Sequence, residues 1–314
     1  MAFDDLEMPY GTFNDVLGGA ATYAAISASM FSPVRLVGVV GSDFPPAVLQ
    51  QMQERGIDIS GVEHAQGKTF RWHGRYAADL SSRETIHTAL NVFADFHPKI
   101  PDSYRTSPYL LLGNIHPALQ LDVLAQVERP RLVVADTMNL WIHTERKTLE
   151  KLLRQVDVVS INDEEAKDLT GEGMLRKAAD AIRAMGPKSV IIKKGEHGAA
   201  LFDDDGIFFV PAYPLEVLRD PTGAGDSFAG ALLGVLAAQG RSDRSDRVAM
   251  RQAMVIASTV ASFGVEGLGP DRLLSLEKSS LAERLRAFEA MVSYGGPLPA
   301  LPQKSVFGGP RAHA

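Results

Sequence analysis

From Tyr109 onward, the chain alternates short apolar runs with runs of helical character. The apolar runs lie at residues 109–112, 132–135, 156–161 and 189–193, and a glycine or a polar residue follows each of them. This alternation predicts an α/β fold with a mostly parallel sheet and helices on both faces. Ligands bind at the carboxyl ends of the strands in such sheets. We therefore expect the site at that edge, which carries Asn114, Asp136, Asn162 and Gly195.

A glycine-rich stretch at residues 220–228 reads Asp-Pro-Thr-Gly-Ala-Gly-Asp-Ser-Phe. Gly223 and Gly225 flank only the methyl group of Ala224, so the backbone can bend and a charged group can approach the amides. A helical run from Phe228 would point its N-terminal amides at the same place. An acid beside a bound anion is repelled by it, so Asp226 needs another reason to be there. The alternative is a glycine turn that caps a buried helix.

This stretch closely resembles the C-terminal motif of the ribokinase family, the PfkB-type carbohydrate and nucleoside kinases. The resemblance implies a three-layer, ribokinase-like and Rossmann-like fold: a mostly parallel central sheet, helices on both faces and a small antiparallel β-lid. It implies that Asp226 is the catalytic base. It also implies an anion hole for the transferred phosphoryl group, formed by Gly223, Ala224 and Gly225.

The acceptor side of the site is expected near the start of the chain. Gly18 and Gly19 precede an alanine-rich helical run and permit close approach of a ligand, although a simple loop turn also explains them. By resemblance, this pair contacts the sugar, and Asp4 holds its hydroxyls, with Asp5 as the other candidate. Asn114, at a strand end, completes the predicted substrate-binding set.

Two departures from the family occur in the same region. Members begin with an apolar strand that ends in glycine before the acid, whereas three residues precede Asp4 here. We therefore expect one strand, about six to eight residues, to be missing. Where ribokinases carry lysine and asparagine for the sugar, this chain has Ala20 and Tyr23. This difference argues against ribose as the acceptor.

Residues 68–76 and 83–92 are rich in threonine, aromatic and alternating residues, which is typical of antiparallel strands. By resemblance they belong to the β-lid, predicted at about 8–17 and 66–96, which covers the sugar and often makes a dimer contact. Alternation turns about half of these side chains away from the site, so we assign none of them as a ligand.

The sequence Asn162-Asp163-Glu164-Glu165 fits two interpretations. It matches a capping box, with Asn162 as N-cap and Glu165 at the third helical position. It also matches the family's Asn-x-x-Glu motif, which helps to place Mg²⁺, its waters and the nucleotide phosphates. Both can hold at once. We favour the functional interpretation because phosphoryl transfer needs Mg²⁺, which prefers carboxylate and water oxygens.

Further nucleotide contacts are expected after the strand at 189–193. Residues 193–198 resemble the family's nucleotide loop, with Lys193 in the position of a threonine and able to pair with a phosphate; an ordinary strand-end turn with solvated lysines is the alternative. Gly264 begins the stretch that matches where the family wraps adenine. By resemblance, Asp220 and Thr222 also lie near a K⁺ site. The predicted nucleotide-binding set is Asn162, Lys193, Gly195, Gly198, Thr222 and Gly264.

Composition narrows the class of partner. The net charge of -6 argues against nucleic acid or an anionic membrane. The absence of cysteine excludes disulfides, a thiol nucleophile and a thiolate zinc site. The apolar runs are shorter than the roughly 18 to 20 residues that span a bilayer, and the acidic start does not resemble a secretory leader. We expect a cytoplasmic protein with one domain over 1–294 and a flexible tail at 295–314.

The resemblance implies an ATP- and Mg²⁺-dependent kinase that phosphorylates a hydroxyl of a sugar or sugar-like molecule, with Asp226 accepting the proton. The chain lacks a P-loop motif. One alternative is a nucleoside kinase. Another is an ATP-dependent NAD(P)H-hydrate dehydratase of the same fold, which lacks the lid and is disfavoured by the strands at 68–92. A third is a non-catalytic sugar or nucleotide sensor. The expected partner is a small molecule, with a homodimer through the lid.

Overall fold

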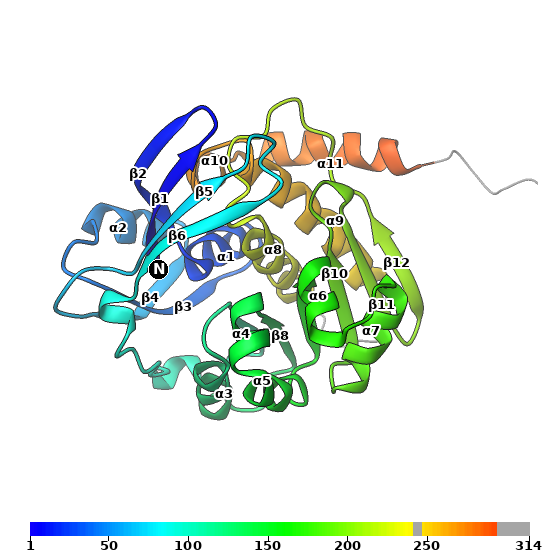
Figure 1. Ribbon diagram of the computed structural model, residues 1–314, viewed down its shortest axis with the longest axis horizontal. Coiled ribbons are helices and arrows are strands. Elements are labelled where there is room, and N and C mark those ends of the chain that lie inside the picture. Colours follow the sequence, from blue (N-terminus) through cyan, green and yellow to red (C-terminus); the bar gives the residue numbers. More distant parts are fainter. Residues whose placement is uncertain (241–246, 294–314) are drawn as a thin grey trace, which may run out of the picture.

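The computed structural model describes residues 1–240 and 247–293, so the predicted tail at 295–314 lies outside the described residues. The strands form three sheets (Figure 1). Their orders are β12-β11-β10-β9-β8-β7, β2-β1-β5-β6 and β3-β4. The extent of the predicted domain, 1–294, stays a prediction.

The six-stranded sheet is the central layer. In it β7 to β10 run parallel, and β11 and β12 continue the sheet as an antiparallel hairpin. Strands β8, β9 and β10 are almost wholly buried, which explains their unbroken apolar character. The bounds are β7 Tyr109–Leu112, β8 Leu132–Asp136, β9 Val158–Asn162, β10 Ser189–Lys193, β11 Ala199–Asp203 and β12 Gly206–Val210.

Helices cover both faces of the central sheet, as predicted. Successive side chains of a strand point to opposite faces of the sheet. Val133, Val159 and Val190 accordingly pack into the core on one face, whereas their neighbours Val134 and Val158 pack into the core on the other face. The first face carries α3 Pro117–Gln126, α4 Asn139–Thr144, α5 Arg146–Leu153, α6 Asp163–Thr170 and α7 Leu175–Ala184. The second core includes residues of α1 Ala20–Ser29, α8 Ala224–Ala238, α9 Arg247–Gly264, α10 Asp271–Leu274 and α11 Lys278–Val292. Short 3₁₀ turns are η1 Asn91–Phe93, η2 Asp102–Tyr104 and η3 Gly195–His197.

A separate pair of parallel strands, β3 Val34–Val40 and β4 Ile57–His64, is joined by α2 Pro46–Glu54. In the part of the chain that the structure describes, neither strand pairs with the central sheet. That one strand of the family fold is missing stays a prediction.

The four-stranded sheet, which we call the lid sheet, consists of β1 Ala2–Met8, β2 Gly11–Gly18, β5 Arg71–Tyr76 and β6 Arg83–Ala89. It begins at Ala2, six residues before the predicted start. It is also mixed, not antiparallel, because β1 and β5 run parallel. The chain reaches β5 from β1 through β3 and β4, a crossover that parallel neighbours require. Figure 1 shows this sheet apart from the green central strands, with α1 and α8 between them in this view.

Helix α8 begins at Ala224, four residues before the predicted start at Phe228. Gly223 is its N-cap, with a left-handed φ of 72° that glycine adopts without strain. Asp226 consequently lies in the first turn of α8. In the same helix, a Cβ on Gly230 would lie 2.2 Å from the carbonyl oxygen of Ala24, so α1 and α8 pack with their backbones in close approach. No helix among the described residues combines the length and apolar character that a membrane span needs.

Candidate active site

Three neighbouring strands bring polar side chains to one edge of the central sheet. Asp136, Asn162 and Lys193 are the last residues of β8, β9 and β10, and the parallel register sets Lys193 beside Asn162. The Lys193 Nζ atom lies 3.2 Å from Oδ2 of Asp136. The two side chains are only 17% and 8% exposed, so the alternative of a solvated lysine is wrong for Lys193.

Lys193 keeps its positive charge in this setting. Burial lowers the pKa of its ammonium group, but the carboxylates of Asp136, Glu165 and Asp226 act in the opposite direction, and the pKa is raised overall. A Cβ on Gly225 would lie 2.9 Å from Nζ, which places the ammonium group directly against the glycine-rich stretch. A cation therefore lies under the loop for which an anion site was predicted.

The glycine-rich loop rests on a buried aromatic ring. A Cβ on Gly223 would lie 2.3–2.4 Å from ring atoms of Tyr23, which is 1% exposed. Of the predicted anion-hole residues, Ala224 has its amide engaged, because it donates to the carbonyl oxygen of Pro221 over 3.3 Å. The amides of Gly225 and Asp226 belong to the first turn of α8 and have no carbonyl of the helix to pair with. They point out of the N-terminus, where they can bind the oxygens of an anion.

Burial raises the pKa of Asp220, and three further carboxyl groups of the site have pKa values raised to about 7. Burial and the charge of Asp136 raise the pKa of Asp226 to about 7, against the opposing effect of Lys193. Burial likewise raises the pKa of Glu165 to about 7, with Asp136 adding to the effect. Burial and Asp220 raise the pKa of Asp4 to about 7. Near neutral pH, each of these groups can take up or release a proton.

Asp4 faces the glycine-rich loop from β1. It is 4% exposed, and its carboxylate lies against Gly18, where a Cβ would be 2.1 Å from Oδ2. Gly19 is the N-cap of α1. Asp5, the other candidate, points to the opposite face of the lid sheet, where it accepts a hydrogen bond of 2.7 Å from Arg71. The structure thus distinguishes the two acids.

Asn114 follows β7, and its side chain is held by an aromatic residue. The Trp141 Nε1–H donates to Asn114 Oδ1 over 3.0 Å, and the ring of Trp141 lies 5.1 Å from that of His116. The side-chain oxygen predicted to bind substrate is therefore already engaged.

Asn162 and Glu165 form a complete capping box at the start of α6, so this interpretation is confirmed. The amide of Glu165 donates to Asn162 Oδ1 over 2.7 Å, and the amide of Asn162 donates to Glu165 Oε2 over 2.9 Å. Among residues 1–240 and 247–293, no three His, Asp or Glu side chains gather as a metal-ion cluster. These two residues can still offer oxygen atoms to Mg²⁺ through water or phosphate, the arrangement that this ion commonly adopts.

Asp220 ties the glycine-rich loop to the stretch after α9. It is 1% exposed, and its two carboxylate oxygens accept from the amides of Thr222, at 2.8 Å, and Gly269, at 3.0 Å. Its own amide donates to Val265, which follows Gly264 at the end of α9. The predicted adenine stretch and the glycine-rich loop are thus adjacent.

The turn between β10 and β11 contains Gly195 and Gly198 at either end of η3. A Cβ on Gly198 would lie 2.1 Å from the carbonyl oxygen of Val210. Close packing against β12 is therefore a sufficient reason for a glycine at 198.

The lid sheet touches the loop through a residue that the sequence analysis did not assign. The hydroxyl groups of Tyr76 and Thr222 lie 2.7 Å apart, and Tyr76 is 6% exposed. Tyr10 adds a second contact, donating to the carbonyl oxygen of Arg219 over 2.6 Å. The alternation of side chains along β5 could have sorted its residues into two faces, but it does not tell which of the two faces lies toward the site.

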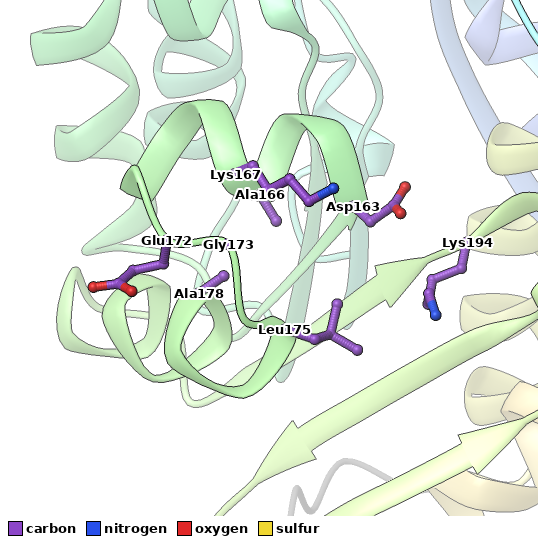
Figure 2. A pocket seen from close by; sticks show the side chains of 8 residues that line it. All are labelled: Asp163, Ala166, Lys167, Glu172, Gly173, Leu175, Ala178 and Lys194. Atoms are coloured by element: carbon purple, nitrogen blue, oxygen red, sulfur yellow. The ribbon is translucent and has the colours of Figure 1, made fainter.

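A pocket lies beside this site, between α6, α7 and the end of β10 (Figure 2). Its lining includes Asp163 and Lys194, which directly follow Asn162 and Lys193 in the chain. The remaining lining residues are Ala166, Lys167, Glu172, Gly173, Leu175 and Ala178. The pocket is therefore adjacent to the strand-end residues, while Asp226 and Asp4 lie outside it.

The known proteins to which this chain is similar are carbohydrate and nucleoside kinases. A family model described as pfkB family carbohydrate kinase matches residues 4–269. Cytidine kinase of Thermococcus kodakarensis is 32% identical over 238 residues, covering 74% of this chain and 84% of that relative. Fructokinase from Vibrio cholerae O395, solved with fructose, ADP and calcium ion, has a TM-score of 0.73 at 19% identity, covering 90% of this chain and 96% of that one. Burkholderia thailandensis nucleoside kinase, solved with inosine, has a TM-score of 0.72 at 18% identity, covering 91% and 94%.

Proposed function

Because the chain belongs to the pfkB family of carbohydrate kinases, we propose that it transfers the γ-phosphoryl group of ATP to a hydroxyl of a sugar or a nucleoside, with Asp226 as the general base. The observation that carries this assignment is the position of Asp226. It lies in the first turn of α8, beside free helix amides, with a pKa raised to about 7 by burial and by Asp136. A base with a pKa near the working pH is best suited to accept a proton during the reaction.

The acceptor hydroxyl is a weak nucleophile, so the proton must leave as the oxygen attacks. Asp226 takes this proton, and the amides of Gly225 and Asp226 stabilise charge on the phosphoryl oxygens, where a preorganised donor is commonly worth about 3 kcal/mol. Asp4 orients the acceptor by accepting hydrogen bonds from its other hydroxyls. Lys193, which keeps its charge, adds electrostatic stabilisation from below the loop.

Mg²⁺ fits this site as an ion held through phosphate and water, with Asn162 and Glu165 as the protein's oxygen donors. When bound, it neutralises phosphate charge. The capping box fixes both side chains before any nucleotide arrives. We also propose that Asp220 and Thr222 lie near a K⁺ ion. A homodimer would form through β6, the exposed edge strand of the lid sheet. We also propose a cytoplasmic location.

The nature of the acceptor can be tested by a coupled ADP-release screen over free sugars, inositols and nucleosides. We expect turnover with at least one hydroxyl compound that depends on both ATP and Mg²⁺. The cytidine kinase likeness, at 32% identity, makes cytidine the first nucleoside to assay. If ADP release stays at the acceptor-free rate for every compound while ATP still binds, a non-catalytic role replaces the proposal.

The pKa of Asp226 also predicts opposite pH dependences for activity and stability. Activity needs the carboxylate, so kcat/KM should be lost as the pH falls through about 7, approaching tenfold per pH unit well below it. The folded pKa lies above the ordinary value of 3.8, so the stability contribution of Asp226 is present below about pH 4 and is lost as the pH rises to about 7. A pH-rate profile and urea denaturation at several pH values measure the two effects; a flat kcat/KM between pH 5.5 and 8 would contradict the first.

A further inference from the structure

A largely buried arginine of α11 is bound to the predicted adenine stretch, residues 264–269. Nη2 of Arg284 donates to Oε1 and Oε2 of Glu266 over 2.8 and 3.1 Å, and Nη1 donates to Oγ of Ser262 over 3.0 Å. The side chains of Arg284 and Glu266 are 15% and 23% exposed. Charge-assisted hydrogen bonds in such a setting are stronger than those of an exposed pair, which solvent screens. Arg284 is also the closer of two arginines that pair with Glu266, since Arg272 approaches it only to 3.9 Å.

Two aromatic rings pack against the same guanidinium group. Its carbon atom lies 3.5 Å from the ring centroid of Phe263 and 5.0 Å from that of Tyr213. Phe263 belongs to the last turn of α9, and Tyr213 lies in the segment that connects β12 to α8. The ring of Tyr213 in turn stacks on Phe288 of α11 at 6.4 Å. Because its guanidinium group packs on rings from two elements, Arg284 has little freedom to leave Glu266.

The predicted adenine stretch is also tied to the glycine-rich loop, on both sides of Glu266. The amides of Arg219 and Asp220 donate to the carbonyl oxygen of Val265 over 2.8 and 3.2 Å. The amide of Gly269 donates to Oδ2 of Asp220 over 3.0 Å. The side chain of Glu266, by contrast, is anchored to α11. The stretch is thus held from two directions along the chain, and Arg284 provides the anchor outside the glycine-rich loop.

We propose that Arg284 is a positioning residue for the nucleotide: by holding Glu266, it keeps residues 264–269 in the conformation that receives the adenine base. This inference rests on the proposed kinase function, in which ATP is the phosphoryl donor. A segment that is already ordered binds its ligand more tightly, because binding does not have to order it. Arg284 acts through Glu266, so its loss weakens nucleotide binding and leaves the chemical step unchanged.

The test measures the Kd of ADP with Mg²⁺ by titration calorimetry, together with steady-state kinetics. Arg284→Ala should raise the Kd of ADP and the KM of ATP about tenfold, as for loss of charge-assisted hydrogen bonds. The kcat and the KM of the acceptor should stay within about twofold of the wild type. Arg284→Lys should be intermediate, because lysine keeps the charge but lacks the planar fork. Arg286→Ala is the matched control: it removes the same charge from an exposed position of α11 and should bind ADP like the wild type.

A second variant tests the pair with less disturbance of the core, because Arg284→Ala also removes packing against Phe263. Glu266→Gln is nearly isosteric and should weaken ADP binding as well. The double variant should bind ADP no more weakly than Arg284→Ala, since the effects of residues that act as a pair do not add. Thermal midpoints of all variants check that each is folded at the assay temperature.

An ADP Kd of Arg284→Ala within twofold of the wild type overturns the inference, and so does an equal weakening in Arg286→Ala. Additive losses in the double variant overturn it too, because Arg284 would then not act through Glu266. A fall of kcat at unchanged ADP affinity contradicts it by placing the effect on the chemical step. A wild-type protein that neither binds ADP nor turns over ATP contradicts the proposed kinase function itself, which distinguishes that failure from one confined to Arg284.

Discussion

Replacing the proposed general base, Asp226→Asn, is expected to reduce kcat by about 10²–10⁴-fold while the KM of ATP stays close to that of the wild type. Asparagine has the same size but cannot take up the acceptor's proton. The side chain lies in the first turn of α8 beside the amides, so the isosteric change leaves the loop in place. Steady-state kinetics with the acceptor found by the ADP-release screen measure the effect.

Measuring the stability of Asp226→Asn tells whether a loss of activity comes from the missing carboxylate or from unfolding. The folded protein penalises the charge of Asp226, since burial raises its pKa to about 7. Asp226→Asn should therefore be at least as stable as the wild type at pH 8 in urea denaturation. Asp122→Asn makes the same chemical change at an exposed position of α3 and serves as the control. Turnover of Asp226→Asn near the wild-type level would rule out this residue as the base.

The second large effect is expected from Gly223→Ala. The new methyl group would meet the ring of Tyr23 at 2.3–2.4 Å, and that ring is 1% exposed and cannot move aside. The φ of 72° adds backbone strain. Together, overpacking and strain should lower the free energy of unfolding by about 2–4 kcal/mol. Kinase activity should fall as well, because the loop cannot keep its position over Tyr23.

Gly171→Ala is the matched control for this variant. Gly171 has nearly the same φ, 73°, but a Cβ there would meet nothing within 4 Å. It should lose only the strain contribution, about 1 kcal/mol. Urea denaturation of both variants at the same pH gives the comparison. Equal losses at the two positions would show that the contact with Tyr23 carries no cost.

Part of the site could be predicted because its residues are local in sequence. Residues 220–228 hold the glycine turn, the acid and the helix start within nine positions, and the capping box spans four. Local backbone chemistry determines such features. The start of α8 was nevertheless placed four residues too late, because Ala224 and Gly225 look like part of a loop until Gly223 is known to cap the helix.

The pairs that connect distant strands could not be predicted in this way. Lys193 and Asp136 are 57 residues apart, and Tyr76 and Thr222 are 146 apart. Nothing near either residue indicates its partner, since each contact depends on the register and order of strands. The mixed lid sheet is a further example, because sequence alternation alone does not give strand direction.

By itself, the sequence determined the α/β class, the family and the glycine turn with its acid at residues 220–228, because periodicity, turns and short motifs depend on neighbouring residues. Only the tertiary structure decided which side chains share the space above that loop. It turned Asp4 inward and Asp5 outward, and it brought Tyr76 of the lid sheet against Thr222 of the loop. The physical reason is that sheet register and the packing of α1 against α8 depend on contacts between residues far apart in the sequence, and burial of the whole core determines them.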